Sequence, residues 1–351
     1  MLSISNIFAA ASMSIQKYIH NQSFQLESGA ILPRVEIAYH TYGELNATGD
    51  NVIWVCHALT ANSDVADWWS GLFGEDKPFN PSKHFIVCAN ILGSCYGSSG
   101  PLTENPETGK PYFRSFPMVT IRDMIKAHQL LQTHLGVKQI QLGMGGSMGG
   151  YQLMEWAIED RDLFKNLCLL VTSAKASAWE IAIHEAQRLA IEADSTWKDD
   201  AANAGDNGMK AARGIGMLTY RNYEAFKQTQ EDTEEKLDDY KAASYIQYQG
   251  EKLTKRFNAQ SYHLLSKAMD SHNLGRGRKS VEGVLAQITA NTLVIGVDSD
   301  ILCPAGEQQF ITEHIPNSKL EIISSPFGHD GFLVESEKIN RLLTDFFEGL
   351  D

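Results

Sequence analysis

Six short apolar runs, each ended by glycine or polar residues, most constrain how this chain can fold. They are NVIWVCHAL (51–59), HFIVCANIL (84–92), KQIQLGM (138–144), NLCLLVTSA (166–174), NTLVIGV (291–297) and SKLEIIS (318–324). Continuous apolar runs of this length are typical of strands that are buried on both faces. Helical patterns lie between several of them, such as residues 120–136, where Gly136 ends the pattern. This alternation predicts an α/β fold in which helices cover both faces of a mostly parallel, doubly wound sheet.

The alternation of strand and helix patterns stops near residue 176 and resumes near residue 285. The sequence between them is poor in strand patterns and rich in Ala, Glu, Lys and Gln, as in SAWEIAIHEAQRLAIEA. We interpret it as a helical insertion of about 110 residues, which is the size of a small domain. Residues 1–175 and 286–351 then form the α/β core, and residues 176–285 form a helical domain inserted into it.

The charge and cysteine content of the chain exclude several classes of protein. With 30 Lys and Arg against 43 Asp and Glu, the formal net charge is −13, which repels nucleic acids and anionic membranes. No apolar stretch approaches the roughly 18 residues of a membrane-spanning helix. The five cysteines are odd in number and contain no C-x-x-C pair, which is typical of reduced thiols, so we expect a cytoplasmic protein. Residues 1–13 lack the positive start of a secretory signal, and we interpret them as a tail or as sequence before a start at Met13.

One serine stands in a glycine-rich turn between a strand pattern and a helix pattern. Gly145-Gly146-Ser147-Met148-Gly149 fits the G-x-S-x-G motif of a nucleophile elbow. In such a turn the serine adopts a strained backbone conformation that exposes its hydroxyl, and larger side chains two positions away would collide with the neighbouring strand and helix. Taken alone, the motif also fits a glycine-rich turn with a purely structural use or one that holds a phosphate.

A serine nucleophile needs a base, and the base needs a carboxylate that orients it. Asp298 and Asp300 directly follow one predicted strand near the C-terminus, and His329 follows the next, between two glycines. The chain order Ser, Asp, His is the one expected of an α/β-hydrolase. We therefore predict a triad of Ser147, His329 and one of the two aspartates, between which spacing does not choose. The alternative is a surface-loop histidine without a catalytic role.

The oxyanion that forms when a serine attacks a carbonyl requires preorganised amide donors. We predict the N–H of Met148, directly after the nucleophile, as one donor, and a second donor in the loop at residues 57–60. His57 in this loop is interpreted as a packed residue, because His329 already supplies the base. Metal catalysis is not expected, since HEAQR at 184–188 lacks the second histidine of the H-E-x-x-H motif.

From Gln25 onward the sequence resembles the homoserine O-acetyltransferase family, acyltransferases with the α/β-hydrolase fold. The resemblance rests on several long blocks in the right order, which are more specific than a triad motif alone. They are CHALTANSD, GPLTENPETGKPY, FPMVTIRDM, GGSMGG with QLMEWA, AARGIGMLTYRN, SYIQYQGEKLTKRF, SDILCP and GHDGFL.

The resemblance implies roles for individual residues. It aligns the catalytic aspartate, in SDILCP, with Asp300, and it puts the second oxyanion amide near Leu59. It also implies that Asp330 holds the ammonium group of an amino-acid substrate, while Arg213, aided by Tyr220, holds its carboxylate. This set is chemically consistent, because a zwitterion needs an anion for its amine and a fixed cation for its carboxylate. Without the resemblance, Arg213 would be interpreted as a surface arginine.

The implied activity is acetyl transfer from acetyl-CoA to L-homoserine in methionine biosynthesis, by a ping-pong mechanism through an acetyl-serine. Acetyl-CoA is then a co-substrate, and no permanently bound cofactor is expected. The helical insertion would form a lid that keeps water from the acyl-enzyme. Family members dimerise through this lid, so we expect a homodimer.

Two further segments are candidates for contacts with the acyl donor. The loop NILGSCYGSSGPLTEN (90–105) departs from the usual family sequence and is a candidate lining of the acyl pocket. The basic segment NLGRGRKS (273–280) is a candidate contact for coenzyme A phosphates, although a solvated loop is the simpler interpretation.

Several alternative functions use the same residues. They are a succinyl donor, a serine acceptor that is one methylene shorter, and a plain esterase, which rapid loss of the acyl group to water would reveal. An inactive interaction module with a hydrolase fold is an alternative of another class. Failure of every thioester to form an acyl-enzyme would favour it.

Overall fold

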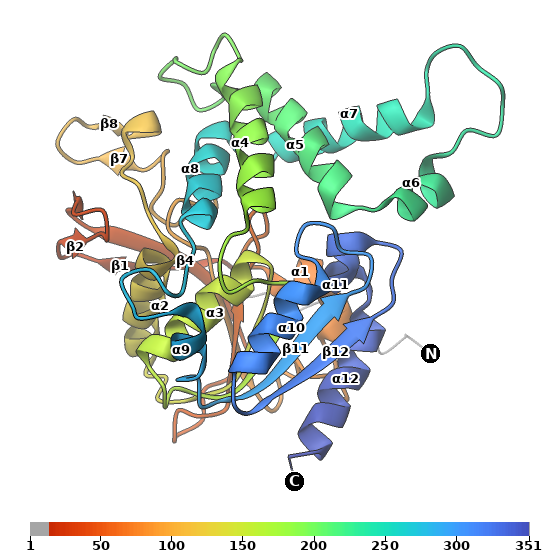
Figure 1. Cartoon of the computed structure of the whole chain (residues 1–351). Coiled ribbons are helices and arrows are strands. Elements are labelled where there is room, and N and C mark those ends of the chain that lie inside the picture. The colour runs from red at the N-terminus through yellow and green to blue at the C-terminus, as the bar shows by residue number, and fades with distance from the viewer. Residues whose placement is uncertain (1–13, 351) are drawn as a thin grey trace, which may run out of the picture.

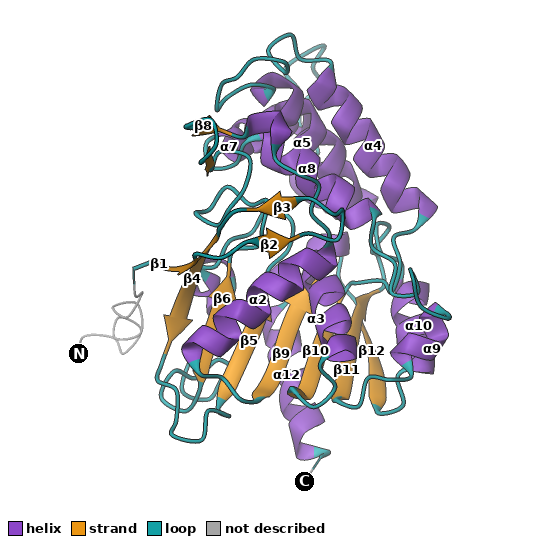
Figure 2. Cartoon of the chain, turned by 90° about the vertical axis from the view of Figure 1, so that its left-hand side faces the viewer, coloured by secondary structure: helices purple, strands orange, loops and turns teal. Residues whose placement is uncertain are grey.

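The computed structural model describes residues 14–350, so the interpretation of residues 1–13 lies outside it. An eight-stranded sheet in the order β1-β4-β6-β5-β9-β10-β11-β12 forms the centre of the molecule (Figure 2). Its strands are β1 (Gln16–His20), β4 (Val35–Tyr42), β5 (Val52–Cys56), β6 (Phe85–Ala89), β9 (Ile140–Gly146), β10 (Phe164–Leu170), β11 (Asn291–Val297) and β12 (Ser318–Ile323). Strands β5, β6 and β9 to β12 run parallel, whereas β4 pairs antiparallel with both β1 and β6. The six apolar runs correspond to the parallel strands, which confirms the predicted fold class.

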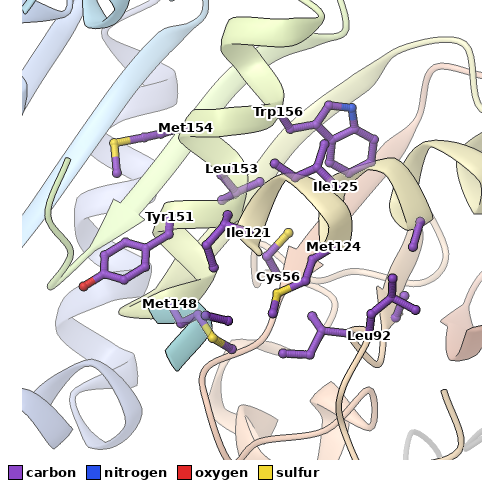
Figure 3. Packing of buried hydrophobic residues seen from close by; sticks show 14 of the residues in the cluster. Cys56, Leu92, Ile121, Met124, Ile125, Met148, Tyr151, Leu153, Met154 and Trp156 are labelled. Carbon is purple, nitrogen blue, oxygen red and sulfur yellow. The ribbon is translucent and has the colours of Figure 1, made fainter. Parts of the chain in front are cut away.

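The two faces of the sheet are covered by different helices. Val52, Trp54 and Cys56 of β5 belong to one buried cluster, whereas Ile53 and Val55 belong to another, because successive side chains of a strand point to opposite faces. The first cluster includes residues of α2 (Ile121–Leu135), α3 (Met148–Glu159), α9 (Val281–Leu285) and α10 (Ala305–His314), and the second includes residues of α1 (Val65–Trp68) and α12 (Ser336–Glu348). Figure 3 shows Cys56 in the first cluster beside side chains of α2 and α3. The sheet is therefore doubly wound, as predicted.

Local signals in the sequence define the ends of α2. Thr120 accepts a hydrogen bond from the N–H of Asp123, whose carboxylate in turn accepts one from the N–H of Thr120. This capping box satisfies donors that the first turn of a helix leaves without partners. At the other end Gly136 has a φ of 76°, a left-handed conformation that glycine adopts without strain. The helix predicted in this region is present with the predicted stop.

A group of helices lies above the ends of the parallel strands, where Figure 1 shows α4, α5, α7 and α8 together. These helices are α4 (Ala178–Glu192), α5 (Asp206–Tyr220), α6 (Tyr223–Gln230), α7 (Lys241–Thr254) and α8 (Ala259–Asp270). Helix α4 packs against α5 and α8, and α5 packs against α7. We call α4 to α8 the lid. Helix α9 falls inside the insertion expected from the sequence, yet it packs against α3 and α10 of the core, so the lid ends at α8.

Short elements complete the chain between these parts. They are β2 (Phe24–Gln25), β3 (Ile31–Leu32), η3 (Ser70–Leu72), β7 (Glu104–Asn105), β8 (Lys110–Pro111), η4 (Phe113–Ser115), η5 (Gly328–Asp330) and α11 (Gly331–Val334). All five cysteines are free thiols, and four of them are buried. Among residues 14–350, every helix is too short or too polar to cross a membrane.

Candidate active site

Ser147 forms a sharp turn between strand β9 and helix α3. Its φ of 54° and ψ of −124° are unusual for a residue with a side chain, and such strain costs about 1–3 kcal/mol. Two hydrogen bonds hold the turn: the N–H of Ser147 donates to the carbonyl of Leu170 at 2.9 Å, and the hydroxyl of Thr172 donates to the carbonyl of Ser147 at 2.8 Å. Neighbouring β10 and the residues after it thus stabilise the conformation expected of a nucleophile elbow.

Glycines flank Ser147 because the neighbouring backbone leaves no room for side chains. A Cβ atom on Gly145 would lie 2.7 Å from the carbonyl carbon of Gly149 and 2.9 Å from the carbonyl oxygen of Cys56. On Gly149 it would lie 2.1 Å from the same carbonyl oxygen of Cys56. Close approach of the strand, the turn and the helix therefore accounts for the glycines of this motif.

The carboxylate of Asp300 orients His329. Nδ1 of His329 donates to Oδ2 of Asp300 at 2.7 Å, and the backbone N–H groups of Leu302 and Cys303 donate to Oδ1 at 2.8 and 3.0 Å. Asp298, which spacing could not distinguish from Asp300, instead accepts a hydrogen bond from a backbone N–H in the loop after β12. The structure therefore selects Asp300 as the partner of the histidine. With Nδ1 protonated, Nε2 of the neutral ring is available to accept a proton.

The electrostatic surroundings of His329 favour its protonated form. Burial on its own lowers the pKa of this imidazole. The negative charge and hydrogen bond of Asp300, with smaller contributions from Asp330 and Glu180, outweigh burial and raise the pKa above the ordinary value of 6.5. An imidazole in this environment can accept a proton and stabilise the resulting charge.

The predicted residues meet at one cavity of about 370 Å³. Leu59, Ser147, Arg213, Tyr220, His329 and Asp330 all line it. Asp300 lies behind His329, and the side chain of Met148 is buried in the core. The ring of Phe332 contacts the turn at Gly146 and lies 5.9 Å from the ring of His329, so the two loops are packed together beside the cavity.

Two backbone segments supply candidate donors for an oxyanion. Met148 is the first residue of α3, and the N–H groups in the first turn of a helix have no acceptor within it. Leu59 belongs to the loop after β5 that forms another wall of the cavity.

His57 in the same loop is fully buried, donates from Nδ1 to the carbonyl of Ala58, and accepts from the N–H of Ile91 at Nε2. Burial lowers the pKa of His57 to about 4, so this ring is neutral and structural.

Arg213 presents an unsatisfied cation to the cavity. Its Nε atom is buried and has no hydrogen-bond partner among residues 14–350. The guanidinium carbon lies 5.4 Å from the centre of the Tyr220 ring, and that ring lies 6.0 Å from the ring of His329. A buried donor without a partner is costly, so this position fits an anionic group of a ligand.

Asp330 has a protein partner that the sequence interpretation missed. Nε of Arg221 donates to Oδ2 of Asp330 at 2.8 Å. Arg221 directly follows Tyr220 in the block AARGIGMLTYRN, and this position was the only signal available in the sequence. Two further cations missed from the sequence, Lys252 and Arg256, also line the cavity.

Two interpretations of loops are corrected by the structure. Residues 90–105 are absent from the described lining of the cavity, and their contact with it is indirect, through a hydrogen bond from Arg256 to the hydroxyl of Tyr96. The basic segment 273–280 is also absent from that lining. Its two arginines already have protein partners, since Arg276 pairs with Glu27 and Arg278 pairs with Glu155. The loop was interpreted from its departure from the family sequence and the basic segment from its composition, and neither signal reveals contacts with distant residues.

A buried carboxylate joins the lid to the catalytic elements. Glu180 in the first turn of α4 is 1% exposed and accepts a hydrogen bond from the hydroxyl of Tyr151 on α3 at 2.5 Å. It also accepts from the N–H of Ser177 at 3.0 Å and from the thiol of Cys303, whose own N–H bonds to Asp300.

Among residues 14–350, no group of three His, Cys, Asp or Glu side chains is arranged to hold a metal ion.

Comparisons with known proteins agree with this geometry. The family described as alpha/beta hydrolase fold matches residues 51–336. A homoserine O-acetyltransferase from Cyclobacterium marinum is 49% identical over 335 residues, which cover 95% of this chain and 95% of the relative.

Two solved structures share the fold. The homoserine O-acetyltransferase from Bacillus anthracis has a TM-score of 0.86 at 23% identity and covers 94% of this chain and 97% of its own. An acetylester hydrolase from Corynebacterium glutamicum has a TM-score of 0.84 at 21% identity and covers 95% of this chain and 96% of its own. The 49% identity to the Cyclobacterium marinum relative extends over nearly the full length of both chains and shows the family. The chain belongs to the homoserine O-acetyltransferase family, on the α/β-hydrolase fold.

Proposed function

We propose that the protein transfers an acetyl group from acetyl-CoA to the hydroxyl of L-homoserine, in methionine biosynthesis in the cytoplasm. One observation carries the proposal: a single cavity combines Ser147 and His329 with the cation Arg213 and the anion Asp330. A hydrolase acting on simple esters needs the first pair only. Opposite fixed charges in the same cavity fit an amino-acid zwitterion, and the relatives are named for acetyl transfer to one.

The first half-reaction forms an acetyl-serine. Oγ of Ser147 attacks the thioester carbonyl of acetyl-CoA while Nε2 of His329 takes the hydroxyl proton, and Asp300 stabilises the imidazolium. The N–H groups of Met148 and Leu59 stabilise the tetrahedral oxyanion. The C–S bond then breaks, His329 returns the proton to the sulfur, and free coenzyme A leaves.

The second half-reaction moves the acetyl group to the acceptor. Homoserine binds with its carboxylate at Arg213, beside Tyr220, and its ammonium group at Asp330. His329 removes the proton of the homoserine hydroxyl, whose oxygen attacks the acetyl carbonyl. The bond to Ser147 breaks, His329 returns the proton to the serine oxygen, and O-acetyl-L-homoserine is released. Because coenzyme A leaves before homoserine reacts, the kinetics are ping-pong.

Acetyl-CoA acts as a substrate in this scheme, and no resident cofactor takes part. Lys252 and Arg256 line the cavity, and their positive charge offers a local attraction for the coenzyme A phosphates in a protein whose net charge is −13.

The lid is the proposed surface of a homodimer. Large apolar side chains on α4 and α5 are more than half exposed in the single chain: Trp179 is 53% exposed, Leu189 57% and Leu218 58%. Their exposure supports an apolar contact there.

Intact-protein mass spectrometry tests the proposal. The protein is incubated with acetyl-CoA or succinyl-CoA, and then with homoserine, serine or buffer. The mass gained identifies the acyl group, and the amino acid that removes it identifies the acceptor. We expect acetyl labelling that homoserine discharges, and no labelling of Ser147→Ala. Labelling by succinyl-CoA alone, or discharge by serine alone, would overturn the stated specificity.

An esterase is the second candidate function, because an acetylester hydrolase shares the fold over nearly the full chain. The same experiment separates the two functions by the fate of the acetyl-serine in buffer. Rapid discharge by water, unaffected by homoserine, would favour the esterase. A stable acetyl-serine that homoserine discharges favours the transferase.

A further inference from the structure

Arg221 links the end of a lid helix to the loop that carries the catalytic histidine. It directly follows α5, and its Nε lies 2.8 Å from Oδ2 of Asp330. The side chains of Arg221 and Asp330 are 24% and 16% exposed, so this ion pair is largely shielded from water. The guanidinium carbon also lies 5.3 Å from the centre of the Phe327 ring, which limits how Arg221 can move.

The backbones on both sides of this ion pair are in contact as well. Helix α5 packs against η5, the short helix that contains His329 and Asp330. Gly328 has a φ of 61°, and a Cβ atom on it would lie 3.0 Å from the carbonyl oxygen of Tyr220. The contact is therefore tight, and it joins the helix that carries Arg213 to the loop that carries Asp330.

We propose that Arg221 is a positioning residue for the amino-acid acceptor. By holding Oδ2 of Asp330, it leaves Oδ1 for the substrate ammonium group and fixes the spacing between Asp330 and Arg213. This inference rests on the proposed function, since the spacing matters only for a ligand that carries both charges. The planar guanidinium of an arginine, whose N–H directions are fixed, suits this role better than a lysine ammonium on a flexible chain.

The inference has a consequence for each half-reaction. Acylation by acetyl-CoA and loss of the acetyl group to water involve no ligand ammonium group. Loss of Arg221 should therefore weaken homoserine binding and leave both of these rates unchanged. Removing a hydrogen bond to a charged group lowers binding by about tenfold, so KM for homoserine should rise about tenfold.

The test compares Arg221→Gln and Arg221→Lys with the wild-type protein. Three quantities are measured for each variant: the rate of acylation by acetyl-CoA, the rate of discharge by water and KM for homoserine. Arg276→Gln is the matched control, because Arg276 also holds a carboxylate, that of Glu27, but is not among the cavity-lining residues. We expect the rise in KM for Arg221→Gln, a smaller rise for Arg221→Lys and none for Arg276→Gln.

A double variant tests whether Arg221 acts through Asp330. If it does, Arg221→Gln adds no further rise in KM to that of Asp330→Asn, because the partner is already altered. Additive rises, or an equal loss in acylation, water discharge and homoserine transfer, would overturn the inference. Should Arg221→Gln fail to fold, Arg221→Lys decides by the same comparison. Wild-type protein that homoserine cannot discharge would instead refute the proposed function, whereas wild-type KM in Arg221→Gln would refute this inference alone.

Discussion

Gly149, two residues after the serine of the elbow, lies directly against the carbonyl oxygen of Cys56: a Cβ atom on Gly149 would be 2.1 Å from that oxygen. Both partners are fixed, because Cys56 ends β5 and Gly149 belongs to the first turn of α3. Parting them would move the helix away from the sheet. The same approach holds the backbone of the turn at Ser147 in place.

Gly149→Ala should therefore destabilise the protein by about 3 kcal/mol or more, since overpacking against backbone cannot relax by a change of rotamer. Gly306→Ala is the control, because Gly306 in α10 has open space around the position of its Cβ. Alanine there should be neutral or stabilise the helix by up to about 1 kcal/mol. Urea unfolding followed by circular dichroism measures both changes. Equal midpoints for Gly149→Ala and the wild type would contradict the prediction.

The acylation rate should fall on the acid side of neutrality. His329 must be neutral to accept the serine proton, and its pKa is raised above 6.5, so the acid limb of kcat/KM should have its midpoint above pH 6.5. In Asp300→Asn the main group that raises this pKa is neutral while burial still lowers it, so the midpoint should move to lower pH. The rate at the optimum should fall about ten-thousandfold. Release of a chromogenic alcohol from an acetyl ester, measured from acid to alkaline pH, gives both midpoints; a midpoint that stays in place would refute this assignment of the cause.

Arg213→Gln should impair acceptor binding without loss of stability. The Nε of Arg213 is without a hydrogen-bond partner among residues 14–350, so its removal breaks no such bond at that atom and loses mainly the contact with the Tyr220 ring. KM for homoserine should rise by about tenfold to a hundredfold, because a charged hydrogen bond to the carboxylate is lost. Acylation by acetyl-CoA should be unchanged.

Arg122→Gln is the control, in which stability should fall and KM for homoserine should not change. Arg122 bonds to Glu27 and to Glu155, whose side chain is 2% exposed. Removing it leaves a buried carboxylate with fewer partners, so the free energy of unfolding should fall by about 3 kcal/mol while KM for homoserine stays unchanged. If Arg213→Gln lost stability and kept its KM, the role assigned to Arg213 would be wrong.

Much of the core fold could be predicted because buried parallel strands are apolar throughout. β1 and β4 were not predicted, and the two strands fail to give that signal for different reasons. Residues of β1 alternate between exposed and partly buried side chains, as an edge strand does, and β4 contains buried polar residues such as His40 and Thr41. Period-two patterns of this length are weak and are easily taken for loops.

The candidate catalytic residues could be chosen from the sequence because each follows a strand, and parallel strands end at the same edge of a sheet. The choice between Asp298 and Asp300 depends on which carboxylate faces the histidine. The conformation of the turn after β11 decides this, and the sequence does not reveal it. The pair formed by Arg221 and Asp330 spans 109 positions of sequence. No local pattern encodes such a contact, because it exists only after the lid has packed on the core.

Glu180 should stabilise the attachment of the lid to the nucleophile helix. Glu180→Ala would leave the hydroxyl of Tyr151 and the N–H of Ser177 without their acceptor, and each buried unsatisfied group costs about 1–3 kcal/mol. We expect a loss of about 3 kcal/mol in unfolding free energy and slower acylation, because Tyr151 lies one turn after Ser147 on α3. Glu180→Gln keeps an acceptor and should lose less. Glu251→Ala on the exposed surface of α7 should be neutral. Thermal unfolding and acylation rates measured together decide the point: if Glu180→Ala matched Glu251→Ala in both, the buried carboxylate would have no part in holding the lid, and the attachment would have to come from the packing of α4 alone.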